Sequence, residues 1–478
     1  MRLTIRAVLT FYWASAITGL LGVSVNEPWL VASAAGFAGL GLFLSDVSRT
    51  RHGGLTAITV FSLFGAATGF ANAVGLYAGN GPFRSVYFIY AVDNHLMLAS
   101  LLGFAATVLP VLGFWAVVRR AAMQRWSDLL PDVKGTIGNR NLLIGASILA
   151  PLVTVFRFLN VIPSLGTVSE VVFLVPQFAV FVLARVGTAR QVRGALPLAL
   201  VLALMEAFRG LVFEYLRLAA VLPIVALVSG AVLGARSLKP LRMKLLLPIY
   251  PLCAIYVLYF GVLGEIRSTN FGGDKLNTLL EYDMSQSSTR EAAAHKETVL
   301  SRLTTFNQLS QIRRVVDEDG FYQGKTLSYL AYAFMPRFLF PDKPRIQRGS
   351  WFAVRIGQAM ETENGWFNNA VNMTVQGELY LNWGWIGIML GLPLYGLALA
   401  VFWSRARFWE DDRNALGTAF GFYVMWAALS AAGDLTILVT ILAVYLLFVA
   451  AGLGMRGVAQ NDPRASARRS VQPTEAAS

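Results

Sequence analysis

Cysteine and histidine are nearly missing from this chain of 478 residues, which has one cysteine, Cys253, and three histidines. A lone cysteine forms no intrachain disulfide. Without paired His or Cys spacing we expect no metal site, and we expect no cofactor. Charged residues are also scarce, at 14% of the chain against 56% hydrophobic residues. This balance excludes an ordinary soluble globular protein and is typical of a polytopic membrane protein.

Acidic residues are the rarer charged class, with 27 Asp and Glu against 40 Lys and Arg and a net charge of +13. In a membrane protein such an excess commonly fixes orientation, because cytoplasmic loops collect Lys and Arg. We therefore expect the lipid bilayer, and no nucleic acid, as a partner of this chain.

Apolar runs that approach or reach the roughly 20 residues needed to cross a bilayer recur along the chain. Because the first run is long for a signal peptide and no A-x-A site follows it, we expect a retained anchor. The sequence predicts about twelve transmembrane helices, at 7–25, 28–45, 54–78, 95–118, 141–160, 167–184, 194–212, 217–235, 245–264, 376–403, 415–432 and 435–455.

The positive charges follow these predicted spans. If both termini are cytoplasmic, most Lys and Arg fall in inner segments, and the short outer connections hold only Arg84, Arg157, Arg209 and Arg217. The positive-inside rule therefore favours cytoplasmic termini. The predicted organisation is spans one to nine in 1–264, a large outer loop in 265–375, three spans in 376–455 and a disordered cytoplasmic tail in 456–478.

The large outer loop has predicted structure of its own. Ser288 and Glu291 form a capping box pattern ahead of an amphipathic helix that we expect to end near Gly320. A short apolar run from Leu327 to Met335 is too short to span and predicts an interfacial or re-entrant helix. The expected apolar stripe of the first helix consists of Val299, Leu303, Phe306, Leu309, Ile312 and Val316.

A dense group of cations follows this short run. Three prolines, Pro336, Pro341 and Pro344, stiffen the chain around it. Since the excess charge opposes the positive-inside bias, we predict a site for a phosphate-type anion. The alternative is a solvated basic loop on lipid headgroups. The group consists of Arg337, Lys343, Arg345, Arg348 and Arg355, with Asp342 as the one acid between them.

Two further constellations contain charges close to hydrocarbon. Arg209 is a candidate anion ligand, and the alternative is structural pairing within Glu206, Arg209, Glu214 and Arg217. Glu378, at the entry of the tenth span, is a candidate general base, with Asp342 as the competing carboxylate and a helix N-terminal role as the alternative. Candidate sugar-binding aromatics are Tyr380, Trp383 and Trp351, with a membrane-interface belt as the alternative for the first two and for Trp385.

The strings MPRFLFPDKP, GSWFAVRIG and TVQGELYLNWGWIG together resemble the bacterial oligosaccharide repeat unit polymerases, the Wzy-type O-antigen and exopolysaccharide polymerases. The resemblance in residue pattern covers about Arg302 to Gly396, and the rest of the chain matches in architecture alone. It implies an all-α polytopic fold of the GT-C type with one large periplasmic loop. The positions that match essential arginines of the family are Arg337, Arg348 and Arg355, with Arg209 in an earlier loop.

What the resemblance implies is a metal-independent glycosyltransferase of the inner membrane. Such an enzyme transfers a growing glycan from undecaprenyl pyrophosphate to the non-reducing end of a new lipid-linked repeat unit at the periplasmic face. Its partners are the donor and acceptor lipids and a chain-length regulator protein. The nearest alternative is an O-antigen ligase, which transfers finished glycan to the lipid A core. A second alternative is a flippase or exporter, which the large loop and the lack of duplicated halves disfavour.

Overall fold

The computed structural model describes residues 2–49, 56–79, 91–119, 130–158, 172, 174–210, 217–234, 304–333, 340, 348–360, 370–407, 413–429 and 435–460. In these ranges the regular structure is helical, apart from one isolated antiparallel bridge between Thr136 and Asn414. The prediction of an all-α chain is confirmed for this part of the protein.

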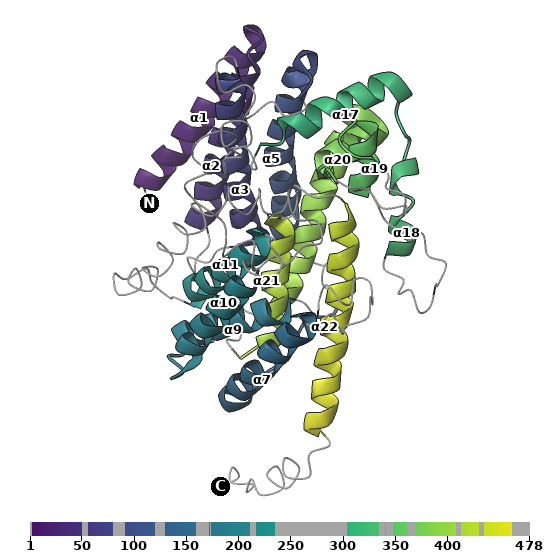
Figure 1. Ribbon diagram of the computed structural model, residues 1–478. Helices are drawn as coiled ribbons and strands as arrows, with labels where there is room; N and C mark the ends of the chain where they lie inside the picture. The colour runs from purple at the N-terminus through teal and green to yellow at the C-terminus, as the bar shows by residue number, and fades with distance from the viewer. Residues whose placement is uncertain are drawn as a thin grey trace, which may run out of the picture.

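Long helices make up the main bundle (Figure 1). They are α1 (Arg2–Ser24), α2 (Pro28–Arg49), α3 (Ala57–Ala78), α5 (Leu96–Arg119), α7 (Asn139–Phe158), α9 (Val175–Ala189), α10 (Ala195–Arg209), α11 (Arg217–Gly234), α20 (Val375–Ala406), α21 (Ala415–Leu429) and α22 (Thr436–Gln460). These overlap eleven of the twelve predicted spans, and the ninth, 245–264, lies outside the described residues.

Seven of the described helices, α1, α2, α3, α5, α7, α20 and α22, are long and apolar enough to cross a membrane. The chain is therefore a helical membrane protein by the length and composition of these helices. The helices α9 and α21 and part of α11 are apolar but shorter. The total of twelve spans remains a prediction.

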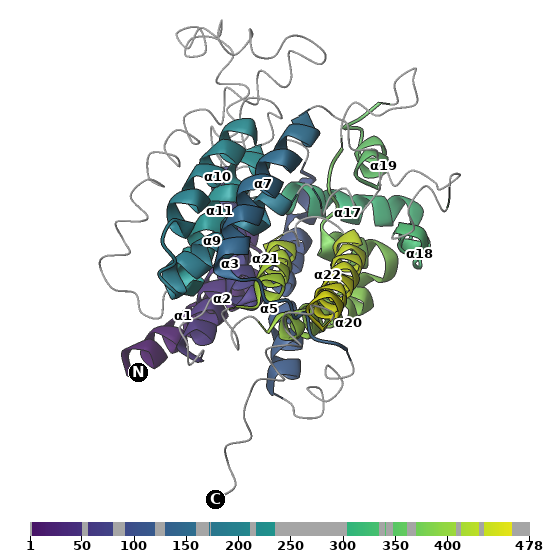
Figure 2. The same ribbon diagram turned by 90° about the horizontal axis from the view of Figure 1, so that it is seen from below.

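The bundle has two groups of helices joined through α21, as Figure 2 shows from below. One group contains α1, α2, α3, α5 and α20, and the other contains α7, α9, α10 and α11. Contact between α5 and α20 is reciprocal: Gly113 faces the Pro393 carbonyl, and Gly396 faces the Pro110 carbonyl. A Cβ at either glycine would overlap the carbonyl oxygen that it faces. Only glycine allows this approach, which fixes α20 against α5.

Short helices cover one end of the bundle, which we call the loop end (Figure 1). They are η1 (Asp93–His95), α17 (Phe306–Asp319), η5 (Lys325–Leu327), α18 (Leu330–Ala333) and α19 (Arg348–Arg355). Asn72, near the end of α3, fixes the start of α17, because its Oδ1 accepts from Thr305 N at 2.7 Å and its Nδ2 donates to Thr305 Oγ1 at 3.1 Å. The loop end is thus tied to the bundle by a buried side chain.

The amphipathic helix predicted in the large loop is α17. Phe306, Leu309, Ile312 and Val316 are all buried, which confirms this part of the expected stripe. The helix ends before Gly320, whose φ of +77° favours glycine, as predicted. The start of the helix was predicted too early, because Thr304 and Thr305 are not helical and α17 begins at Phe306, so Val299 and Leu303 do not belong to this helix. The capping box at Ser288 and Glu291 lies outside the described residues. Of the predicted interfacial run, α18 is the described helical part.

The opposite end of the bundle carries a cluster of cations around one acid. Asp132 lies 3.0 Å from each of Lys134 Nζ, Arg405 Nη1 and Arg407 Nε. In Figure 1, α22 runs from the loop end to this opposite end, and α1 begins away from the loop end. The end of α22 therefore lies on the side with the cation cluster, where a Cβ at Gly452 would meet the Lys134 carbonyl oxygen.

Helix α20 is interrupted near its start. Gly384 has φ +59° and ψ −141°, which is not helical, and a Cβ there would lie 2.9 Å from the Phe321 ring. Glycine avoids both the backbone strain and the collision. The turns before Gly384 carry Glu378 and Tyr380, so the break sets how these residues meet the loop end.

Candidate anion-binding site at the loop end

Glu378 lies in the first turn of α20, after the N-cap Thr374, and its side chain is 0% exposed. Its Oε1 accepts from Arg348 Nη2 at 2.9 Å, and its Oε2 accepts from Tyr329 Oη and from Leu435 N, both at 3.2 Å. Burial of a carboxylate is costly unless it is paired and hydrogen-bonded, and these donors meet that requirement. One carboxylate therefore joins α20 to α19, to the turn before α18 and to the start of α22.

Arg348, the first residue of α19, is held on several sides. Its guanidinium carbon lies 5.1 Å from the centre of the Tyr329 ring and 5.4 Å from that of Trp351. Its side chain is 15% exposed, and its buried Nε has no hydrogen-bond partner in the described structure. Carboxylate and rings together fix the plane of the guanidinium. A guanidinium that is fixed in this way and still partly exposed suits a phosphate-type anion.

The charge of Arg348 is balanced by Glu378, so the pair is neutral overall. Strong attraction of an anion requires further positive charge nearby. The predicted cations Lys343 and Arg345 shortly precede Arg348 in the chain, and they lie outside the described residues, as do Arg337 and Asp342. Their proposed roles remain predictions.

Arg355, the last residue of α19, is paired with a different element. Its Nε donates to Asp319 Oδ2 at 2.9 Å, and its Nη2 donates to Glu318 Oε2 at 3.1 Å. The hydrogen bond from Arg355 lowers the pKa of Asp319 below its ordinary value, and Tyr322 adds to this by donating from its hydroxyl. The same contact with Asp319 raises the pKa of Arg355. Arg355 is therefore occupied by the acids at the end of α17.

The two arginines of α19 do not share one site. Seven residues of α-helix correspond to a rise of about 10 Å, so Arg348 and Arg355 lie at opposite ends of α19. Glu378 holds the first end and Asp319 the second. Among the predicted anion ligands in the described structure, Arg348 has the geometry that best suits the role.

Arg209 belongs to a separate buried pair in the other group of helices. Its Nε donates to Glu206 Oε2 at 3.0 Å, and the two side chains are 5% and 1% exposed. Gln177 Nε2 also donates to Glu206, at 3.3 Å, and Thr154 Oγ1 donates to its other oxygen. The arrangement favours structural pairing for Arg209. Glu214 and the side chain of Arg217 lie outside the described residues.

The candidate sugar-binding aromatics differ in exposure. Tyr380 is 2% exposed, its ring packs edge-on against Phe321 and Trp385, and its hydroxyl accepts from Arg313 Nη1 at 3.0 Å. Trp351 packs against Tyr322 and Arg348. Trp383 is 42% exposed, so its position suits either a sugar or the membrane interface. Within the described structure, no group of three His, Cys, Asp or Glu is arranged to hold a metal ion.

The sequence did not indicate Tyr329 or Leu435 as partners of Glu378. Tyr329 lies in an apolar run, and Leu435 contributes a backbone N–H, which no side-chain pattern reveals. Comparisons with known proteins give no further guide, since the chain matches no protein-family model, no curated protein and no solved structure.

Proposed function

We propose that this protein is a membrane glycosyltransferase that polymerises lipid-linked oligosaccharide repeat units. The observation that carries the proposal is the guanidinium of Arg348, held by the fully buried Glu378 and by two aromatic rings at the loop end. Such a fixed cation suits the pyrophosphate of a lipid-linked glycan, whose phosphates lie at the membrane surface. The residue pattern from about Arg302 to Gly396 supports the same assignment.

The proposed reaction is a transfer at C1 of the donor sugar. An acceptor hydroxyl oxygen forms the new bond to C1, the bond from C1 to the phosphate oxygen breaks, and undecaprenyl pyrophosphate leaves with that electron pair. Negative charge grows on the leaving pyrophosphate, so a preorganised cation lowers the barrier. Arg348 supplies one such cation, and Arg337, Lys343 and Arg345 are the proposed additional ones.

A base is needed for the proton of the acceptor hydroxyl. Glu378 is 0% exposed and already accepts from Arg348, Tyr329 and Leu435. This environment favours a positioning role for Glu378 within the proposal. Asp342, the second candidate from the sequence, is then the first carboxylate to test as the base.

The proposed orientation has the loop end in the periplasm of a bacterial inner membrane. The cation cluster around Asp132 at the other end supports it, because cytoplasmic ends of membrane proteins are rich in Lys and Arg. Both chain termini would then be cytoplasmic.

The experiment that tests the function is deletion of the gene followed by analysis of lipid-linked glycans. A polymerase predicts single repeat units accumulating on undecaprenyl pyrophosphate, with long chains restored by the wild-type gene. Finished polymer remaining on the lipid carrier would instead indicate a ligase, and unchanged glycans at the periplasmic face would contradict both. Complementation with Arg348→Ala, at matched protein level, then tests whether the site itself is responsible.

A further inference from the structure

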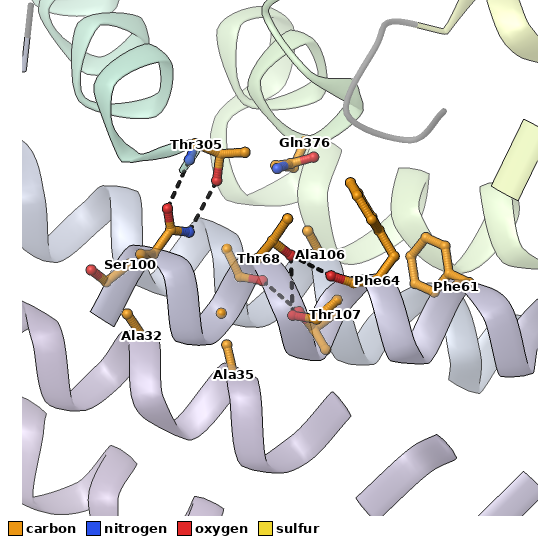
Figure 3. Close-up of a pocket in the computed structure, with 14 residues that line it drawn as sticks. Ala32, Ala35, Phe61, Phe64, Thr68, Ser100, Ala106, Thr107, Thr305 and Gln376 are labelled. Atoms are coloured by element: carbon orange, nitrogen blue, oxygen red, sulfur yellow. Dashed lines mark hydrogen bonds between the residues drawn. The ribbon is translucent and has the colours of Figure 1, made fainter. Parts of the chain in front are cut away.

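A pocket lies between α2, α3 and α5, beneath the starts of α17 and α20 (Figure 3). Its volume is about 50 Å³. Thr305 and Gln376 lie along one side, and Ala32 and Ala35 lie along the opposite side (Figure 3). This volume exceeds the space of a single water, but it holds only a segment of a larger ligand.

Two buried polar groups form no hydrogen bond to the other residues of the lining. Ser100 is 2% exposed, and its Oγ has no hydrogen-bond partner within the described structure. Gln376 is 7% exposed, and no hydrogen bond joins its amide to the other lining residues (Figure 3). Asn72, by contrast, is occupied by Thr305. A buried hydroxyl without a partner, such as that of Ser100, is uncommon and requires an explanation, which a bound polar group provides.

The lining changes in character along α3. Phe61, Phe64, Thr68 and Asn72 face the pocket over about three turns of α3, a length of about 16 Å from Phe61 to Asn72, with Asn72 nearest the loop end. The deep part is therefore aromatic and aliphatic, and the part near the loop end is polar. This polarity matches an amphiphile whose head lies at the loop end.

One side of the pocket is open. Phe64, Thr68, Gly103 and Ala106 are each partly exposed, although they lie in helices long enough to span the membrane. If these helices span the bilayer, as their length and composition indicate, this open side lies at the depth of the hydrocarbon. A lipid chain can therefore enter sideways, with part of the chain in the pocket and the rest in the bilayer.

The pocket and the Arg348 site lie on different sides of α20. Gln376 lines the pocket and Glu378 binds Arg348, and two helical residues are separated by about 200° around the axis. The pocket is thus distinct from the proposed pyrophosphate site. A transfer between two lipid-linked glycans requires two lipids, and this geometry provides a separate place for the second.

We propose that this pocket binds the isoprenoid chain of the second lipid-linked substrate, with the polar end of that lipid at Gln376. The assignment to a second substrate rests on the proposed function. Small residues such as Gly103 and Ala106 leave width for the methyl branches of an isoprenoid.

The test uses purified full-length protein and a photoreactive polyprenyl phosphate with a diazirine in its chain. Crosslinked peptides are mapped by mass spectrometry, with unlabelled undecaprenyl phosphate or phosphatidylglycerol as competitor. We expect crosslinks on α3 and α5, reduced at least tenfold by undecaprenyl phosphate and unchanged by phosphatidylglycerol. Equal competition by phosphatidylglycerol, or crosslinks spread evenly over the exposed faces of α1 and α7, would overturn the proposal.

A variant that fills the pocket provides a second measurement. A Cβ at Gly103 would meet only Asn72 Nδ2, at 3.8 Å, and a Cβ at Gly145 in α7 would meet nothing within 4 Å. We expect Gly103→Leu to reduce crosslinking at least fivefold and the matched control Gly145→Leu to leave it unchanged. If Gly103→Leu lowers the melting temperature, Ala106→Leu fills the same pocket from a partly exposed position. Full crosslinking in a folded filling variant would refute the site.

These readouts are independent of glycan synthesis. If the gene deletion excludes a polymerase while crosslinking remains specific for isoprenoid, the proposed function fails and the isoprenoid site stands. If the deletion supports a polymerase but crosslinking is not specific, the function stands and the pocket assignment fails.

Discussion

Arg348 and Glu378 form an ion pair, with 2.9 Å between Nη2 and Oε1, that joins the first residue of α19 to the first turn of α20. The carboxylate is completely buried and the guanidinium is largely so. Each residue therefore depends on the other, because either charge left alone in this environment would be poorly solvated. The same pair connects the covering helices of the loop end to the membrane bundle.

Replacement of Arg348 tests the proposed pyrophosphate contact. We expect Arg348→Ala to abolish chain extension and Arg348→Lys to retain a small part, because lysine keeps the charge but not the planar fork of donors. The measurement is polymer length in the deletion strain. The matched control is Arg314→Ala on α17, whose side chain is 34% exposed and pairs with Glu318, and which should keep normal chain length. Normal polymer from Arg348→Ala would contradict the site.

Replacement of Glu378 tests whether its carboxylate and the Arg348 guanidinium stabilise each other in the folded protein. Glu378→Ala leaves Arg348 without its carboxylate, and loss of one partner of a buried pair costs about 3–5 kcal/mol in unfolding free energy. We expect the double variant with Arg348→Ala to recover part of this loss in a thermal unfolding cycle. Additive losses would show that the two residues do not act together.

The isosteric variant Glu378→Gln tests whether Glu378 positions Arg348 or acts as the general base in the proposed transfer. If Glu378 positions Arg348, the rate falls but its dependence on pH keeps the same shape. If Glu378 is the base, the limb of the pH profile that reports its ionisation disappears. The matched comparison is Asp342→Asn, for which we expect that limb to be lost.

Acidification should release one end of α19. The pKa of Asp319 is lowered in the folded protein, chiefly by the hydrogen bond from Arg355. Its contribution is therefore fully present above the ordinary pKa of 3.8 and is lost as the pH falls through the lower folded pKa. We expect the protection factors of the amides in the last turn of α19, which correct for the intrinsic pH dependence of hydrogen exchange, to fall below about pH 4. In Asp319→Asn the exchange should already be fast at neutral pH, and equal protection in both proteins would disprove the contribution.

Gly384 should not tolerate a side chain. An alanine there would combine a strained backbone with a Cβ 2.9 Å from the Phe321 ring, at a cost of about 1–3 kcal/mol for the backbone alone. We expect a lower melting temperature for Gly384→Ala. Phe321→Leu should relieve the collision but not the backbone strain, so partial rescue is expected. Gly138→Ala, where a Cβ meets nothing within 4 Å, is the control and should melt normally.

Much of the fold could be predicted because a helix that crosses the hydrocarbon of a bilayer needs about 20 consecutive, mostly apolar residues. Runs of apolar residues correspond to α1, α2 and α22. A 3.6-residue period with a final glycine correctly predicted an amphipathic helix that ends at Gly320, although α17 begins at Phe306 and not before Val299. In each case the information lies in neighbouring residues.

The candidate site could be predicted only in part. Glu378 and Arg348 are both predicted site residues, but their pairing spans 30 positions, and that of Glu378 with Leu435 spans 57. No local period encodes such contacts. The sequence pattern places Arg348 and Arg355 in one predicted anion site. In the structure the helical rise of α19 separates them, and the acids of α17 pair with Arg355.

The backbone break at Gly384 has a consequence for engineering the chain. The stretch Val375–Trp383 is continuous with α20 in sequence, yet the break gives it its own direction, and Tyr322 and Gln323 donate their backbone N–H groups to Leu381 and Asn382. The stretch Val375–Trp383 is therefore held by the residues of the loop end rather than by the rest of α20. A chimaera joined at Gly384 would therefore transplant Glu378 together with Arg348 and Tyr329 and leave only the Leu435 N–H to the other parent, whereas a junction at the apparent start of the span would separate Glu378 from both side chains.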